Sequence, residues 1–67
     1  MQITTTINQA SLIGADHLTM VCTPVESEAE ALVLQRTVGL AVNTDRVGAC
    51  LEGDTLTLQC FVFPDAA

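Results

Sequence analysis

The sequence contains no lysine, tryptophan or tyrosine, and only two arginines and two phenylalanines among its 67 residues. Eight acidic residues against Arg36 and Arg46 give a net charge of −6. Proteins that bind nucleic acid or anionic membranes use basic side chains to neutralise phosphate groups. We therefore expect no direct nucleic-acid binding and no membrane binding. An acidic surface suits a basic protein partner, or solubility alone.

Long hydrophobic runs are also missing. No stretch approaches the roughly 18 apolar residues of a membrane span, and the start, MQITTTINQ, has neither the basic region nor the apolar run of a secretory signal. We therefore expect a cytoplasmic protein that forms a single small domain over residues 1–67. A chain this short buries only about 60 % of the surface that its unfolded form exposes, so we expect a homodimer.

The cysteines are few and scattered. Cys22, Cys50 and Cys60 form no C-x-x-C pair, and His17 is the single histidine, so the four ligands of a usual zinc site are not supplied. His17 and Cys22 have opposite parity on one expected strand, which separates the thiol from the imidazole. We expect reduced, structural cysteines, as is usual in the cytoplasm.

Signals for catalysis are weak as well. Glu26 and Glu30 are four residues apart, but two carboxylates near a helix start are more typical of a solvated cluster than of an acid–base pair. The four glycines are isolated and form no phosphate-binding loop. The sequence therefore predicts no enzyme, no cofactor and no metal.

The firmest local prediction is a helix over residues 23–38, TPVESEAEALVLQRTV. Thr23 is a suitable N-cap, a proline follows at the first helical position, and Glu26 completes a capping box. Either Gly39 ends the helix in a left-handed conformation, or the helix continues and Asn43 ends it.

Two apolar stripes run along this helix at about 100° per residue, where an ordinary surface helix has one. We expect one stripe to pack on the chain's own sheet and the other to contact a partner. The first stripe contains Val25, Ala29, Leu32 and Val33, with Arg36 near its end, and the second contains Ala31, Leu34 and Val38.

Alternation of apolar residues with threonine predicts strands before the helix, over residues 2–7 and 17–23. Residues 8–16 are ambiguous. They could extend the first strand to Ile13 and turn at Gly14, or form a short helical turn, and we favour the hairpin.

A second hairpin is predicted over residues 46–63, around a two-residue Gly53-Asp54 loop. That loop sets a register that pairs apolar residues on one face, and a slip of one residue would break the pairing. The expected pairs are Leu51 with Leu56, Ala49 with Leu58, and Val47 with Cys60. Phe61 and Phe63 fall on the opposite face.

The predicted order is therefore β-β-α-β-β, a mostly antiparallel four-stranded sheet with one helix packed on a face, in the α+β class. Fold alone does not specify function.

A small, acidic chain without catalytic residues is typical of the accessory proteins of phages and mobile elements, including anti-CRISPR and anti-restriction inhibitors. We expect a non-enzymatic inhibitor or adaptor that sterically blocks a larger protein with a basic surface. The expected partner-binding acidic edge consists of Glu26, Glu28, Glu30, Glu52 and Asp54.

The alternative is a homo-oligomeric structural module with no inhibitory role, in which the acidic residues only maintain solubility. Its expected interface consists of Ala31, Leu34, Val38, Phe61 and Phe63.

Overall fold

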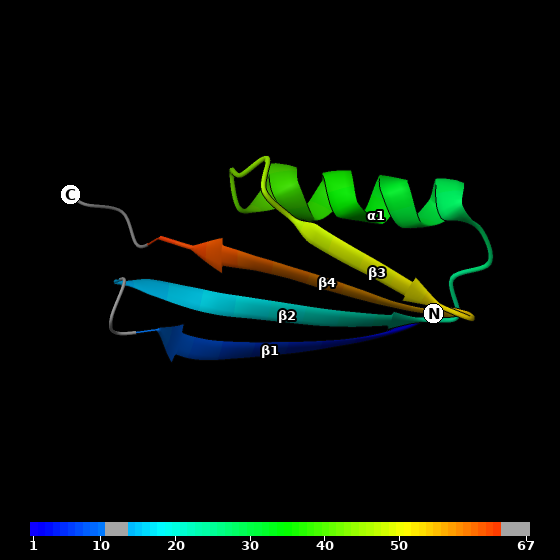
Figure 1. Ribbon diagram of the computed structural model, residues 1–67, viewed down its shortest axis with the longest axis horizontal. Helices are drawn as coiled ribbons and strands as arrows, with labels where there is room; N and C mark the ends of the chain where they lie inside the picture. The colour runs from blue at the N-terminus through cyan, green and yellow to red at the C-terminus, as the bar shows by residue number, and fades with distance from the viewer. Residues whose placement is uncertain (11–13, 64–67) are drawn as a thin grey trace.

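The computed structural model describes residues 1–10 and 14–63, which form one open antiparallel sheet and one helix (Figure 1). The predicted α+β fold with the order β-β-α-β-β is confirmed. The strands lie in the spatial order β1-β2-β4-β3. In chain order, the elements are β1 (Gln2–Ala10), β2 (Ala15–Thr23), α1 (Glu28–Ala41), β3 (Gly48–Glu52) and β4 (Thr55–Val62).

The described parts of the ambiguous segment, residues 8–10 and 14–16, belong to the first hairpin, as we favoured. β1 pairs with β2 in an uninterrupted register from Gln2 opposite Thr23 to Ala10 opposite Ala15. Gly14 adopts a φ of 67°, a left-handed conformation that glycine reaches without steric cost. The predicted extension of the strand to Ile13 lies outside the described residues.

The register of the second hairpin follows its turn. Leu51 pairs with Leu56 and Ala49 with Leu58, as predicted. Gly53 has a φ of 61° at the first central position of the loop, which is the pattern of a type II′ turn. The third predicted pair is not part of the ladder, because β3 begins only at Gly48; Val47 nevertheless lies buried in the core.

The helix begins four residues later than predicted. Ser27, not Thr23, is the N-cap, and its side-chain oxygen accepts a 3.1 Å hydrogen bond from the backbone N–H of Glu30. Thr23 instead ends β2, where it pairs with Gln2. Residues 24–27 connect the strand to the helix, and within them Val25 is only 2 % exposed.

The end of the helix matches the longer of the two alternatives. Val42 is the C-cap and Asn43 follows with a φ of 57°. Gly39 lies inside the helix and is buried, so it does not end it. A Cβ atom at Gly39 would approach the carbonyl oxygen of Thr44 to 2.7 Å, which explains why this position has no side chain.

The core lies between α1 and one face of the sheet, and it is aliphatic. Leu56 and Cys22 are fully buried, and Leu58 is 1 % exposed. Figure 1 shows α1 lying along the β3 side of the sheet, with β1 at the far edge. The helix therefore covers only part of the sheet. Ala31, Val38, Val47, Leu18 and Cys60 complete the buried cluster, together with Val25.

Candidate functional site

One hydrogen bond brings the predicted acidic residues to one end of the molecule. The backbone N–H of Val25 donates to the carbonyl oxygen of Asp54 at 2.7 Å, so the turn between β3 and β4 lies against the segment that precedes α1. Figure 1 shows this turn and the start of α1 at the same end of the fold. We call this region the acidic end; it contains Glu26, Glu28, Glu30, Glu52 and Asp54.

The carboxylates of the acidic end have different environments. Glu30 is half-buried, and its Oε2 accepts a 3.2 Å hydrogen bond from the backbone N–H of Glu26. Glu30 thus satisfies a backbone donor one residue before the N-cap Ser27, whereas a capping box would satisfy the N–H of the cap itself. Glu28, Glu52 and Asp54 are exposed. The N-terminal end of the helix dipole favours the carboxylates of the first turn, so this concentration of charge is partly compensated within the fold.

The two apolar stripes of the helix are reversed relative to our expectation. Ala31 and Val38 are each 8 % exposed, and Leu34 packs against the same core, so the stripe expected at an oligomer interface faces the chain's own sheet. The other stripe does not include Val25, because this residue lies in the segment that precedes the helix, where its side chain is buried. The first stripe is therefore shorter within the helix than predicted.

The solvent-facing side of α1 is consequently apolar over most of its length. Leu32 is 48 % exposed, Val33 62 % and Leu40 84 %. We call this surface the outer helix stripe; it contains Ala29, Leu32, Val33, Arg36 and Leu40, all exposed. It begins within the first turn of the helix, directly beside Glu28 of the acidic end. The sequence had indicated these residues as a stripe but not which way the stripe faces, and Leu40 was missed.

The two phenylalanines lie at the C-terminal end of β4, and Phe61 faces the side of the sheet opposite α1 because it alternates with the buried Leu58 and Cys60. Phe61 is 46 % exposed and Phe63 is 65 % exposed. Phe61 lies opposite His17 on the neighbouring strand, with ring centroids 5.1 Å apart and planes tilted by 50°. Within the described residues, this face of the sheet has no helix over it, so Phe61 remains accessible. Phe63 lies beyond the end of β4 and on the α1 side, so its predicted place beside Phe61 on the opposite face is not confirmed.

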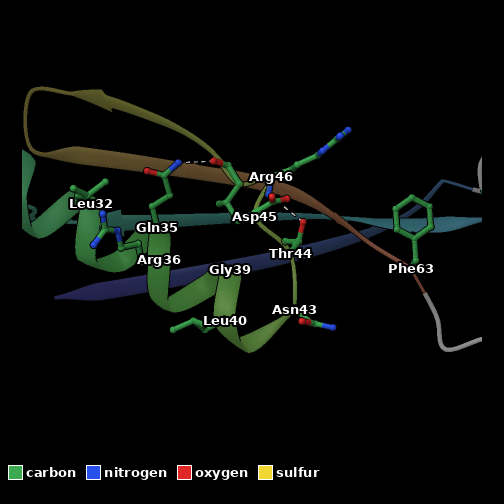
Figure 2. A pocket seen from close by; sticks show the side chains of 11 residues that line it. Leu32, Gln35, Arg36, Gly39, Leu40, Asn43, Thr44, Asp45, Arg46 and Phe63 are labelled. Atoms are coloured by element: carbon green, nitrogen blue, oxygen red, sulfur yellow. Dashed lines mark hydrogen bonds between the residues drawn. The ribbon is translucent and has the colours of Figure 1, made fainter.

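An open groove of about 950 Å³ runs beside the C-terminal half of α1. Its lining includes Leu32, Leu40, Phe63 and both arginines (Figure 2). Figure 2 shows the Arg36 and Arg46 side chains on different sides of the groove, pointing apart. Gln35 closes part of the base by donating a hydrogen bond from Nε2 to the carbonyl oxygen of Val47. The groove therefore does not direct both guanidinium groups at one anion.

All three cysteines are free thiols. Cys22 and Cys60 are buried, and burial raises the pKa of both thiols, so they remain protonated near neutral pH. Cys50 is exposed on β3. Residues 1–10 and 14–63 contain no cluster of three or more His, Cys, Asp or Glu side chains able to hold a metal ion, and no helix long and apolar enough to cross a membrane.

The acidic end and the outer helix stripe thus form the candidate functional surface. No family model matches the chain, and comparisons with curated proteins and with solved structures also find no match.

Proposed function

We propose that this chain is a non-enzymatic protein-binding module, an inhibitor or adaptor that sterically blocks a larger protein with a basic surface. The phage and mobile-element accessory proteins, including anti-CRISPR and anti-restriction inhibitors, are the proposed class. One observation carries the proposal: the outer helix stripe is exposed along α1 and continues into the acidic end.

The apolar part of this surface supports binding to another protein. A helix on the surface of a monomer normally turns polar residues to solvent, whereas α1 presents Leu32, Val33 and Leu40. Contiguous exposed apolar side chains with a polar rim are characteristic of protein interfaces. The outer helix stripe would form the centre of the contact, and the acidic end would form one side of the rim.

The charged part of the surface selects the partner. Five carboxylates at one end, in a chain of net charge −6, would accelerate encounter with a basic groove. An enzyme that binds DNA has such a groove, and occupation by this chain would exclude the nucleic acid. A cytoplasmic location belongs to the same proposal, and three free cysteines suit it.

The apolar part is tested by capturing a partner from host extract with the tagged chain and comparing two variants. Val33→Lys places a charge in the outer helix stripe, and Gln59→Lys places the same charge at an exposed position on β4, outside that stripe. We expect Val33→Lys to abolish capture and Gln59→Lys to preserve it. Equal capture by both variants would contradict a contact through α1.

The charged part is tested with two variants of equal net charge. Glu28→Gln with Glu52→Gln removes two carboxylates from the acidic end, whereas Asp16→Asn with Asp45→Asn removes two from elsewhere. Once the captured partner is purified, we expect the first pair to lower the association rate several-fold more than the second. Capture that survives charge reversal of Glu26, Glu28 and Glu30 together would exclude docking through the acidic end.

The alternative proposal is a homo-oligomeric module without an inhibitory role. The exposed Phe61, on the face of the sheet away from α1, and the exposed Phe63, just beyond β4, favour a second apolar contact. Absolute mass in solution at low and high salt tests this alternative. A dimer that is insensitive to salt supports it, whereas a monomer at all concentrations overturns it.

A further inference from the structure

β1 is an unprotected sheet edge. Among residues 1–10 and 14–63, it is the outermost strand of the sheet, spans nine residues and pairs only with β2 (Figure 1). Along its free side, alternate residues present backbone N–H and C=O groups to solvent. Every residue from Met1 to Gln9 is exposed.

Natural sheets usually block such an edge with a charge, a proline, a bulge or a short strand. β1 has none of these: QITTTINQA contains no charged residue and no proline, and its register with β2 is continuous. The opposite edge strand, β3, is five residues long, ends in Glu52 and lies beside α1. Only the β1 edge is thus left both long and uncharged within the described sheet.

The apolar surface of the core side continues onto this edge. Ile3 pairs with Cys22 and Ile7 with Leu18, so both isoleucines share the face of the sheet that carries the core. Cys22 and Leu18 are buried, but Ile3 is 53 % exposed and Ile7 is 64 % exposed. The core therefore ends at β2, and the next row of apolar side chains is uncovered.

We infer that the β1 edge pairs with the β1 edge of a second copy of this chain, in antiparallel orientation about a two-fold axis. The pairing that best matches side chains is centred on Thr5, because it places Ile3 of one copy opposite Ile7 of the other, twice by symmetry. The two sheets become one sheet of eight strands. Because a two-fold axis between antiparallel neighbours stands perpendicular to the sheet, both α1 helices lie on the same face.

Charge favours a second copy at this edge over the acidic end. Two chains of net charge −6 repel each other, and repulsion is smallest where neither contributes a carboxylate. Residues 2–10 are uncharged, whereas the acidic end carries five carboxylates. The inference specifies the contact for the homo-oligomeric alternative and does not depend on the acidic end or on a foreign partner.

The test is the mass of the full chain, measured by light scattering after size exclusion over a concentration series. We expect a dimer for the wild type and for Val33→Lys, and a monomer with an unchanged circular dichroism spectrum for Ile7→Lys. A wild-type monomer would overturn both this inference and the homo-oligomeric alternative. A dimer in Ile7→Lys would overturn this inference alone and leave that alternative standing.

Cross-linking tests the strand pairing in a protein that still folds and dimerises. In a Cys50→Ser background, Thr5→Cys places two thiols opposite each other at the axis, within the Cα separation that a disulfide spans. Asn8→Cys is the matched control, because its two thiols would lie six residues apart along the strands, about 20 Å. Under mild oxidation we expect a covalent dimer from Thr5→Cys only. No cross-link, or equal cross-linking of both variants, would overturn the pairing.

Discussion

The backbone N–H of Val25 lies 2.7 Å from the carbonyl oxygen of Asp54, and this bond joins the segment before α1 to the turn of the second hairpin. Val25 itself is 2 % exposed, so its side chain and its N–H act together as an anchor. This contact places the carboxylates of the two segments at the same end of the molecule and so forms the acidic end.

Val25→Ala should therefore lower the free energy of unfolding by about 2 kcal/mol, from lost burial and the cavity that remains. Val33→Ala is the matched control, because Val33 is 62 % exposed, and its effect should stay within about 0.5 kcal/mol. Denaturant unfolding of both variants checks this, and equal losses would contradict the anchoring role.

The N-cap can be identified by substitution. Ser27→Ala removes the acceptor for the Glu30 N–H and should cost about 1 kcal/mol. The Glu30 amide should then exchange its hydrogen faster. Thr23→Ala, at the end of β2, should leave that exchange rate unchanged. If Thr23 were the N-cap, Thr23→Ala would instead speed exchange of the Glu26 amide, three residues later, and Ser27→Ala would leave the Glu30 amide unchanged.

Gly39→Ala tests the contact between α1 and the loop that follows it. Alanine favours a helix over glycine by about 1 kcal/mol, but the added Cβ would lie 2.7 Å from the Thr44 carbonyl oxygen. Overpacking of this kind costs about 1–3 kcal/mol, so we expect a net loss of stability. Gly48→Ala, whose Cβ would lie 3.6 Å from the Gln59 carbonyl oxygen, should be tolerated. A thermal melt of each variant measures the difference.

Thiol accessibility should divide the cysteines into two classes. Cys50 is exposed and should react with a disulfide reagent in the native protein. Cys22 and Cys60 are buried, and their raised pKa values keep them protonated, so they should react only after unfolding. Mass spectrometry of the modified native chain identifies the site. Rapid native labelling of Cys22 would contradict the buried core.

Stability should fall as the pH rises above the ordinary range for thiol ionisation. Burial raises the pKa of Cys22 and Cys60 in the folded chain, so the unfolded chain loses these protons first. The free energy of unfolding is therefore highest below the unfolded-state pKa and decreases above it. Urea titrations across alkaline pH measure the slope. The Cys22→Ala/Cys60→Ala variant should have a shallower slope, and an unchanged one would assign the effect to other groups.

The parts of the fold that sequence predicts best are those where two signals agree. In the second hairpin, the Gly53-Asp54 loop and the pairing of Leu51 with Leu56 independently require the same register. The β2 alternation is equally clear, because Leu18 and Cys22 both reach the core. Where two local signals agree in this way, tertiary contacts cannot easily favour a different register.

The helix start was mispredicted because the sequence offers two similar caps. Thr23 and Ser27 are each followed by a glutamate three residues later, Glu26 and Glu30. The choice between them depends on the bond from Val25 to Asp54, a contact across 29 positions that no local pattern contains. Which of the two apolar stripes faces the sheet is likewise set by packing on the sheet, and no local pattern distinguishes them.

Strand order also governs how this chain reaches its native state. The pairs β1–β2 and β3–β4 are hairpins of neighbouring segments, which form in about 1–10 μs. β2 and β4 are separated by the whole of α1 and β3, so their pairing must await a larger loop closure. The pairing of β2 with β4 is therefore the slow step of folding. Until these strands pair, each hairpin is too small to be stable alone. Cooperative folding of this chain therefore depends on the pairing of β2 with β4.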